Sequence, residues 1–247
     1  MQSNGLILLS PVDLGMAAGL VLLLAALSWN LRLGIGRRML VASLRSTVQL
    51  LLLGLVLKTL FASTNPWLVA ALAAVMLGVA GYEVMARQKY RFRGAWGYGT
   101  GALSMFLSSF SIALLALLVL LQPAPWYTPQ YAIPLLGMML GNTMTGVALA
   151  MERLVDALRR DRLAVESMLA LGYTRSEAFR PATRSAVRAA LIPVINTMAA
   201  TGLVFLPGMM TGQILAGADP GLAVKYQMLV IFLIAGGTGL GVIIAVK

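Results

Sequence analysis

The sequence contains no cysteine and no histidine among its 247 residues. Disulfide bonds, thiolate or imidazole metal sites, and catalytic triads that use either residue are therefore excluded. Charge is also scarce, at 11% of the residues, whereas 60% are hydrophobic and the mean hydropathy is +0.87. Because a soluble fold could not bury this much apolar surface, the composition predicts an all-α polytopic membrane protein with the bilayer as its solvent.

Seven apolar stretches are long enough to cross a bilayer, which takes about 20 residues. The sequence predicts one transmembrane domain over residues 1–247, with spans near residues 12–30, 39–60, 67–86, 102–121, 131–151, 186–206 and 226–246. Arg and Lys gather in alternate connections, which should face the cytoplasm by the positive-inside rule. We therefore expect an integral protein of the cytoplasmic (inner) membrane, with its N-terminus outside and its C-terminus inside.

A small set of polar and thioether side chains inside or beside the spans supplies the candidates for a translocation path, since an unpartnered polar group in hydrocarbon costs several kcal/mol. No Asp or Glu lies at the centre of a span, which disfavours a carrier driven by a proton or sodium gradient. The candidates are Arg45, Gln49, Glu83, Asn142, Thr143, Met144, Asn196, Met209, Met210, Gln213, Tyr226 and Gln227.

The second and third spans hold the charged members of this set. Arg45 and Gln49 are one helical turn apart, and the depth of Glu83 allows it to form an ion pair with Arg45. Such a pair would line a water-filled vestibule. Alternatively, Arg45 extends to the interface by snorkelling and Glu83 neutralises the charged loop that follows it.

The later spans hold amide, hydroxyl and thioether groups. The order Asn-Thr-Met occurs at 142–144 and again at 196–198, where the side chains either form hydrogen bonds between helices or offer ligands to a passing cation. Pro207, Gly208 and Gly212 predict a broken helix over 206–213, which would be a gate, a substrate contact or an outer loop. Whether a metal ion is coordinated directly stays open.

Residues 152–188 are the polar part of the chain and carry 13 of its 27 charged residues. Within this island the sequence predicts a short amphipathic helix that ends at Gly172 and a second helix capped by Thr174 or Ser176 with Glu177 close behind. The chain has no phosphate-binding loop of the Gly-x-x-x-x-Gly-Lys-Ser/Thr type, so it does not bind and hydrolyse ATP by that route. Helix, glycine turn and helix on the inner face resemble the element with which ABC transporter permeases contact their ATPase.

The match to that coupling element rests on Glu166 and Gly172, which have its spacing, while Ser167 and Met168 replace two alanines. Further segments resemble the FetB (YbbM) family of ABC permeases over nearly the whole chain: 45–54, 141–144 with Glu152 and Arg153, 166–172, and 202–217 with Tyr226 and Gln227. The resemblance implies an iron exporter that works with a separate FetA-type ATPase, which would bind ATP and Mg. Plant relatives are linked to aluminium tolerance and, in one proposal, to export of sugar nucleotides.

The sequence thus predicts the permease subunit of an ATP-driven exporter of iron or an iron complex, acting as a homodimer in the lipid bilayer without nucleic acid. Contacts with the ATPase would come from Glu166, Leu169, Leu171, Gly172 and Tyr173. No cofactor is expected on this chain, and no catalytic residues are expected because a clustered nucleophile and base are missing. The alternative functions are an ion-coupled secondary transporter or channel, an ABC exporter of an organic anion such as a sugar nucleotide, and a membrane-bound enzyme. For the segment 166–172 alone, the alternative is an inner loop packed on its own bundle.

The orientation of the spans yields a direct test. A cysteine introduced at Pro123 should react with an impermeant thiol reagent from outside, and one introduced at Arg160 should react only after permeabilisation, because positive-inside orientation places these loops on opposite sides. The native chain has no thiol to interfere. The reverse labelling at either position would end the seven-span topology.

Overall fold

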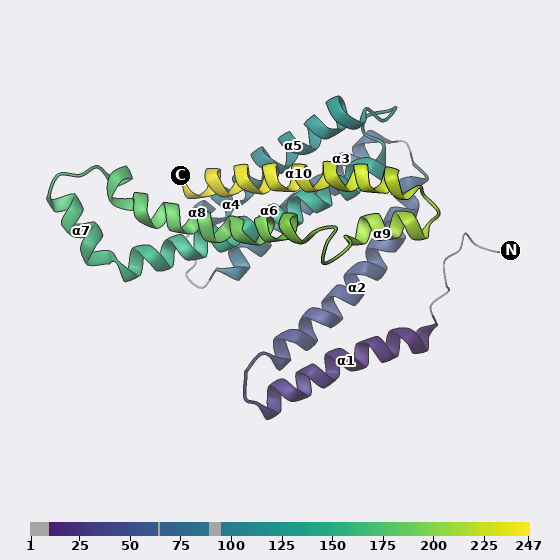
Figure 1. Cartoon of the computed structure of the whole chain (residues 1–247), viewed down its shortest axis with the longest axis horizontal. Helices are drawn as coiled ribbons and strands as arrows, with labels where there is room; N and C mark the ends of the chain where they lie inside the picture. Colours follow the sequence, from purple (N-terminus) through teal and green to yellow (C-terminus); the bar gives the residue numbers. More distant parts are fainter. Residues whose placement is uncertain (1–9, 64, 89–94) are drawn as a thin grey trace. The chain divides into compact units, whose positions relative to one another are not determined.

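The structure is a computed structural model that describes residues 10–63, 65–88 and 95–247. Every regular element in these ranges is helical (Figure 1). The helices are α1 (Pro11–Asn30), α2 (Gly36–Phe61), α3 (Pro66–Arg87), α4 (Ala95–Met105), α5 (Ser111–Leu115), α6 (Pro129–Arg160), α7 (Arg162–Ala170), α8 (Arg175–Ala200), α9 (Gly208–Leu215) and α10 (Pro220–Val246), with π-helical segments η1 (Phe106–Phe110) and η2 (Ala116–Leu121).

The chain divides into two compact units. The first comprises residues 1–64 with 215–217 and contains α1 packed against α2. The second comprises residues 65–214 and 218–247 and contains the other helices, with α6 in contact with α3, α8 and α10. The second unit holds the candidate site described below.

Local signals set where several helices begin. Asn65 accepts a hydrogen bond from the backbone N–H of Trp67 at the start of α3, and Asp219 accepts one from Leu222 at the start of α10. Each is followed by a proline at the first helical position, where its missing N–H would be unpaired anyway. The Asn65-Pro66 and Asp219-Pro220 pairs therefore mark helix starts.

Within the part of the chain that the structure describes, six helices are long and apolar enough to span a membrane. They are α1, α2, α3, the helical segment Gly101–Leu121 that runs from α4 to η2, α6 and α10. They agree with six of the seven predicted spans. The sixth predicted span, 186–206, differs because its helix α8 begins at Arg175 in the charged island and ends at Ala200. A seventh span stays a prediction.

The expected break over 206–213 lies earlier in the chain than the glycines suggested. The helix stops before Thr201, Gly202 has a φ of +83°, and its N–H donates a hydrogen bond to the carbonyl of Phe205. Gly208 and Gly212 lie within α9 instead of breaking it. Pro207 directly precedes α9, a position where a proline is tolerated because it lies outside the helix interior.

The core of the second unit surrounds α6, whose buried residues pack with those of α3, α4 and α5. Val84, Met105 and Val147 are fully buried there. On another side α6 crosses α10 closely: a methyl added to Gly146 would lie 2.6 Å from Cγ2 of Thr238. Small residues at such crossings let two backbones approach, which is how helices gain packing energy in lipid.

This close crossing predicts unequal effects for two similar substitutions in α6. Gly146→Ala should destabilise the protein by about 1–3 kcal/mol, because the new methyl group collides with Thr238 on α10. Gly141→Ala is the matched control, since no heavy atom lies within 4 Å of the added carbon. Unfolding in mild detergent, followed by circular dichroism, measures both. Equal stability of the two variants would contradict the crossing.

Candidate functional site

The charged island forms a helical hairpin that extends from the apolar bundle. Ala150, Ala190 and Val242 make a buried cluster against which Val246, the last residue of α10, also packs. From Ala150, α6 continues to Arg160, which is about 15 Å at 1.5 Å per residue. A headgroup layer is about 5–8 Å thick. The tip of the hairpin, α7, therefore lies further from this cluster than one headgroup layer is thick, past the C-terminal end of α10 (Figure 1).

The turn at the end of α7 is specified by backbone chemistry. The N–H of Gly172 donates to the carbonyl of Leu169, and the N–H of Tyr173 donates to that of Met168, both at 3.1 Å. These two bonds form a Schellman motif, which needs a left-handed residue at its glycine position. Gly172 has a φ of +89°, so the glycine turn predicted at the end of this helix is confirmed, and its conformation is left-handed.

The start of α8 is fixed by a capping box between Thr174 and Glu177. The Thr174 hydroxyl accepts from the N–H of Glu177, and the Glu177 carboxylate accepts from both the N–H and the hydroxyl of Thr174. These hydrogen bonds, with a smaller contribution from Arg180, lower the pKa of Glu177. The prediction of a helix, a glycine turn and a helix capped by Thr174 is confirmed as local structure.

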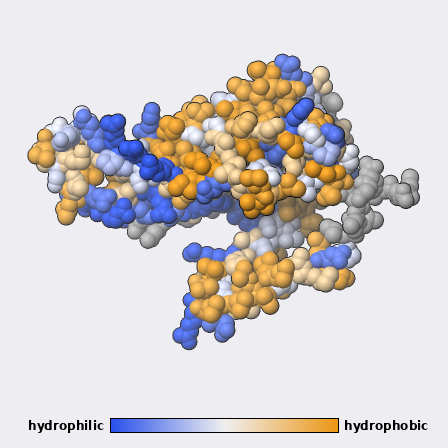
Figure 2. Space-filling model, in the orientation of Figure 1, coloured by the Kyte–Doolittle hydropathy of each residue, from blue (hydrophilic) through white to orange (hydrophobic). Residues whose placement is uncertain are grey.

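The α7 surface combines exposed apolar side chains with charge. None of its residues is buried, and the side chains of Leu163 and Leu171 are 80% and 78% exposed. Leu169 and Tyr173 are exposed beside them. Figure 2 shows hydrophilic residues gathered over this end of the second unit, with apolar atoms at the tip.

Glu166 forms an ion pair within its own helix. Its Oε1 is 2.7 Å from Nε of Arg162, one turn earlier on the same helix. This hydrogen bond raises the pKa of Arg162. The carboxylate is therefore engaged on α7 itself, although both side chains remain more than half exposed. Leu163, which was not among the residues predicted from the sequence, is 80% exposed on the same helix; its only signal was an apolar residue inside the island.

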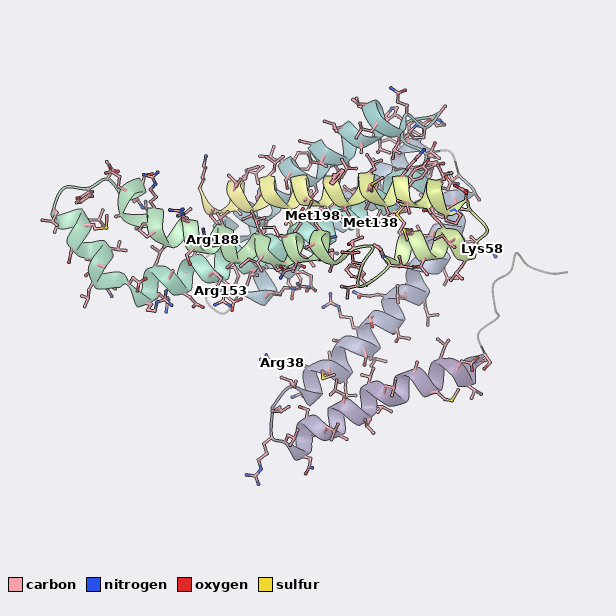
Figure 3. All side chains as sticks on the ribbon, viewed as in Figure 1. Arg38, Lys58, Met138, Arg153, Arg188 and Met198 are labelled. Atoms are coloured by element: carbon pink, nitrogen blue, oxygen red, sulfur yellow. The ribbon has the colours of Figure 1, made fainter. Side chains whose placement is uncertain are left out.

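A groove of about 140 Å³ lies between α6, α8 and α10. Its polar lining comes from Asn142 and Thr145 on α6 and Thr197 on α8, with Met198 beside them. Met138 and Met198 are labelled in Figure 3, on these neighbouring helices. Apolar residues complete the wall: Gly146, Leu149, Ala190, Pro193, Val194, Ile231 and Ile234.

Each polar side chain of the groove already donates one hydrogen bond to the backbone of its own helix. Nδ2 of Asn142 donates to the carbonyl of Met138 at 2.8 Å, and the Thr145 and Thr197 hydroxyls donate to the carbonyls four residues earlier. The amide oxygen of Asn142 and the hydroxyl lone pairs remain as acceptors. The polar groups that line the groove are thus neutral. They can accept hydrogen bonds from a bound molecule or coordinate a cation weakly through oxygen.

The two Asn-Thr-Met segments each send only part of their side chains to this groove. On α6, Asn142 lines the groove, Thr143 is fully buried and Met144 packs against the core. On α8, Thr197 and Met198 line the groove, and Asn196 is exposed outside its lining. Thr145 and Thr197 are polar residues within predicted spans that the sequence did not single out as site residues. Thr145 lies three residues after Asn142, and Thr197 lies four residues after Pro193. Residues at these spacings share one face of a helix, which was the available signal that both threonines line the groove.

The other candidate residues lie away from this groove. Met210, Gln213 and Gln227 are wholly or partly buried on α9 and α10, and among the described residues no hydrogen-bond partner is present for Oε1 of either glutamine. Met209 and Tyr226 are half-buried on the same helices. A shared path for these residues and the groove stays a prediction.

The charged candidates of the second and third spans lie in different units. Arg45 and Gln49 are on α2, whereas Glu83 is on α3 with Oε2 3.9 Å from Nε of Arg87. The contact with Arg87 is the one expected if Glu83 neutralises charge at the end of its span. The pair between Arg45 and Glu83 stays a prediction.

Comparison with known proteins covers nearly the whole chain. The family described as "Uncharacterised protein family (UPF0014)" matches residues 11–247. A membrane protein of this family from Synechocystis is 42% identical over 94% of this chain and 89% of its own length. No solved structure matches.

Two relatives have names that mention a physiological role. Escherichia coli has a probable iron export permease protein, FetB, that is 32% identical over 94% of this chain and 88% of its own length. The Arabidopsis protein ALUMINUM SENSITIVE 3 is 36% identical over 89% of this chain and 79% of its own length. With its apolar helices and this coverage, the chain is an integral membrane protein that belongs to the UPF0014 family.

Proposed function

We propose that this chain is the permease subunit of an ATP-driven exporter whose ATP hydrolysis takes place on a separate ABC ATPase subunit. Two copies of the permease would act with two copies of the ATPase. The observation that carries the proposal is the α7 tip, which projects from the apolar bundle on the hairpin and exposes Leu163 and Leu171. Burial of a leucine side chain is worth about 1.5–3 kcal/mol, so a partner that covers both would gain substantial affinity.

The construction of the hairpin supports transmission of force as well as contact. The tip is joined to α6 and α8, and these two helices also carry Asn142, Thr145 and Thr197 of the groove. A displacement of α7 by an ATPase would therefore move helices that line the groove. The capping box and the Schellman motif hold the tip in one backbone conformation, which favours rigid movement of the hairpin.

The proposed cargo is iron in the form of a complex. The name of the Escherichia coli relative supports iron. The groove supports a complex, because amide and hydroxyl groups form hydrogen bonds with the oxygen atoms of a chelator, whereas a bare iron ion favours charged or imidazole ligands. The same neutral hydrogen-bonding groups also suit an organic anion. Arg residues at the hairpin end of α6 and α8 would attract its negative charge.

The coupling role is tested by changing the two exposed leucines together. The Leu163→Asp/Leu171→Asp variant should remain inserted and folded, but should lose ATPase co-purification by at least about tenfold per leucine, since each burial lost exceeds 1.4 kcal/mol. Gly172→Val should act in the same direction, because a branched side chain strains the left-handed turn by about 1 kcal/mol or more.

The control is Leu203→Asp, which makes the same change at a leucine that is 89% exposed in the segment between α8 and α9. Because this position lies within the predicted span 186–206, insertion of the variant is verified first. This variant should co-purify with the ATPase as the native chain does. Retention of the ATPase by the double variant and by Gly172→Val would contradict the proposed coupling role of α7. A parallel Glu166→Arg variant reports whether the carboxylate bound to Arg162 contributes.

A further inference from the structure

Three hydroxyl side chains are buried where η1, α6 and α10 meet. Ser108 on η1, Thr143 on α6 and Thr238 on α10 are each at most 1% exposed. A carbon added to Gly241 of α10 would collide with Cγ2 of Thr143 and lie 2.8 Å from Oγ of Ser108, so the three elements approach one another at this glycine. Thr238, one turn earlier on α10, places its Cγ2 against Gly146 of α6. We call Ser108, Thr143 and Thr238 the hydroxyl junction.

Two hydroxyls of the junction are left without a hydrogen bond by the protein. Ser108 donates to a carbonyl one turn earlier at 2.7 Å, whereas among the described residues neither Oγ1 of Thr143 nor Oγ1 of Thr238 has a partner. This differs from Thr145 and Thr197, whose hydroxyls donate to carbonyls of their own helices. Folded proteins rarely leave a buried hydroxyl unsatisfied, so the two threonines indicate a bound partner such as water or an ion.

A small space lies in front of the Thr143 hydroxyl. A carbon added to Gly237 of α10 would be 3.8 Å from Oγ1 of Thr143, 3.6 Å from Sδ of Met139 and 3.9 Å from Cβ of Ile112, which are ordinary contact distances. Met139 and Thr143 are one turn apart on α6 and therefore share a face. Because Gly237 is itself buried, this space is inside the bundle. It accommodates one atom of the size of a methyl carbon or a water oxygen.

The groups around this space favour water over an ion. They are a hydroxyl, a thioether and an aliphatic carbon, and none of them carries a charge. A desolvated cation here would have no counter-charge, and its desolvation would cost far more than the immobilisation of a water molecule. Water both donates and accepts, so it can satisfy the Thr143 hydroxyl in either orientation.

We propose that the hydroxyl junction binds internal water, with one molecule beside Gly237 in a hydrogen bond with Oγ1 of Thr143. The thioether of Met139 is a weak second acceptor for this molecule. Thr238 offers a further unpaired hydroxyl at the same crossing of α6 and α10. The site lies apart from α7, so its existence does not depend on the proposed contact with an ATPase.

The test is X-ray radiolysis of the full-length protein in lipid nanodiscs, read by mass spectrometry. A pulse converts bound water into hydroxyl radicals, which oxidise the nearest sulfur before they diffuse away. Met139 should therefore be oxidised at least about tenfold faster than Met105, because only Met139 has an oxidant beside it. Both side chains are 0% exposed, and Met105 packs in the apolar core cluster, which makes it the internal control.

Two variants should remove the water by different routes. Gly237→Ala places a methyl group in the space, and Thr143→Val removes the hydroxyl while keeping the shape of the side chain. Each should lower the oxidation of Met139 to that of Met105. The matched controls are Gly236→Ala, where no heavy atom lies within 4 Å of the added carbon, and Thr143→Ser, which keeps the hydroxyl. Both controls should keep the native rate.

Several results would overturn the proposal. They are equal oxidation of Met139 and Met105 in the native chain, native oxidation of Met139 in folded Gly237→Ala or Thr143→Val, and loss of this oxidation in either control. Suppression by sodium or potassium chloride, but not by choline chloride, would assign the site to a cation and overturn the assignment to water. Circular dichroism verifies the fold of each variant. If one variant does not fold, the other variant and the native comparison decide.

Discussion

The thickness of the bilayer constrains this molecule most strongly through one helix. A hydrocarbon core of about 30 Å accommodates about 20 helical residues, and α6 has 32. Because the helix remains regular to Arg160, its last turns must emerge on one side. The exposed tip and the return of α8 follow from that excess length.

The same helix connects the candidate sites. Its buried face packs on α3 and on the close crossing with α10, and another part of its surface lines the groove with Asn142 and Thr145. The tip and the groove are therefore separate regions of one rigid element rather than two independent parts. A permease driven from outside the membrane requires such a connection, since force applied at α7 must reach the cargo.

Local signals made the hairpin predictable. Gly172 and the Thr174 to Glu177 spacing specify a turn and a cap through hydrogen bonds between neighbouring residues, so no tertiary information was needed. The direction of side chains on long apolar helices is different. It depends on how each helix is rotated against its neighbours, which explains why Thr143 is buried beside Asn142 in the groove and why Thr197 replaces the expected Asn196. The end of α8 was missed because Thr201 to Phe205 resemble a continuing span in hydropathy.

The central claim is that ATP hydrolysis on a partner drives transport through this chain. The most direct measurement is export from liposomes that contain the permease and its ATPase, with iron, iron chelates and sugar nucleotides compared as cargo. The proposal predicts that transport of an iron chelate requires ATP and continues when proton and sodium gradients are abolished. Transport by the permease alone, stopped by collapse of an ion gradient and indifferent to ATP, would contradict it.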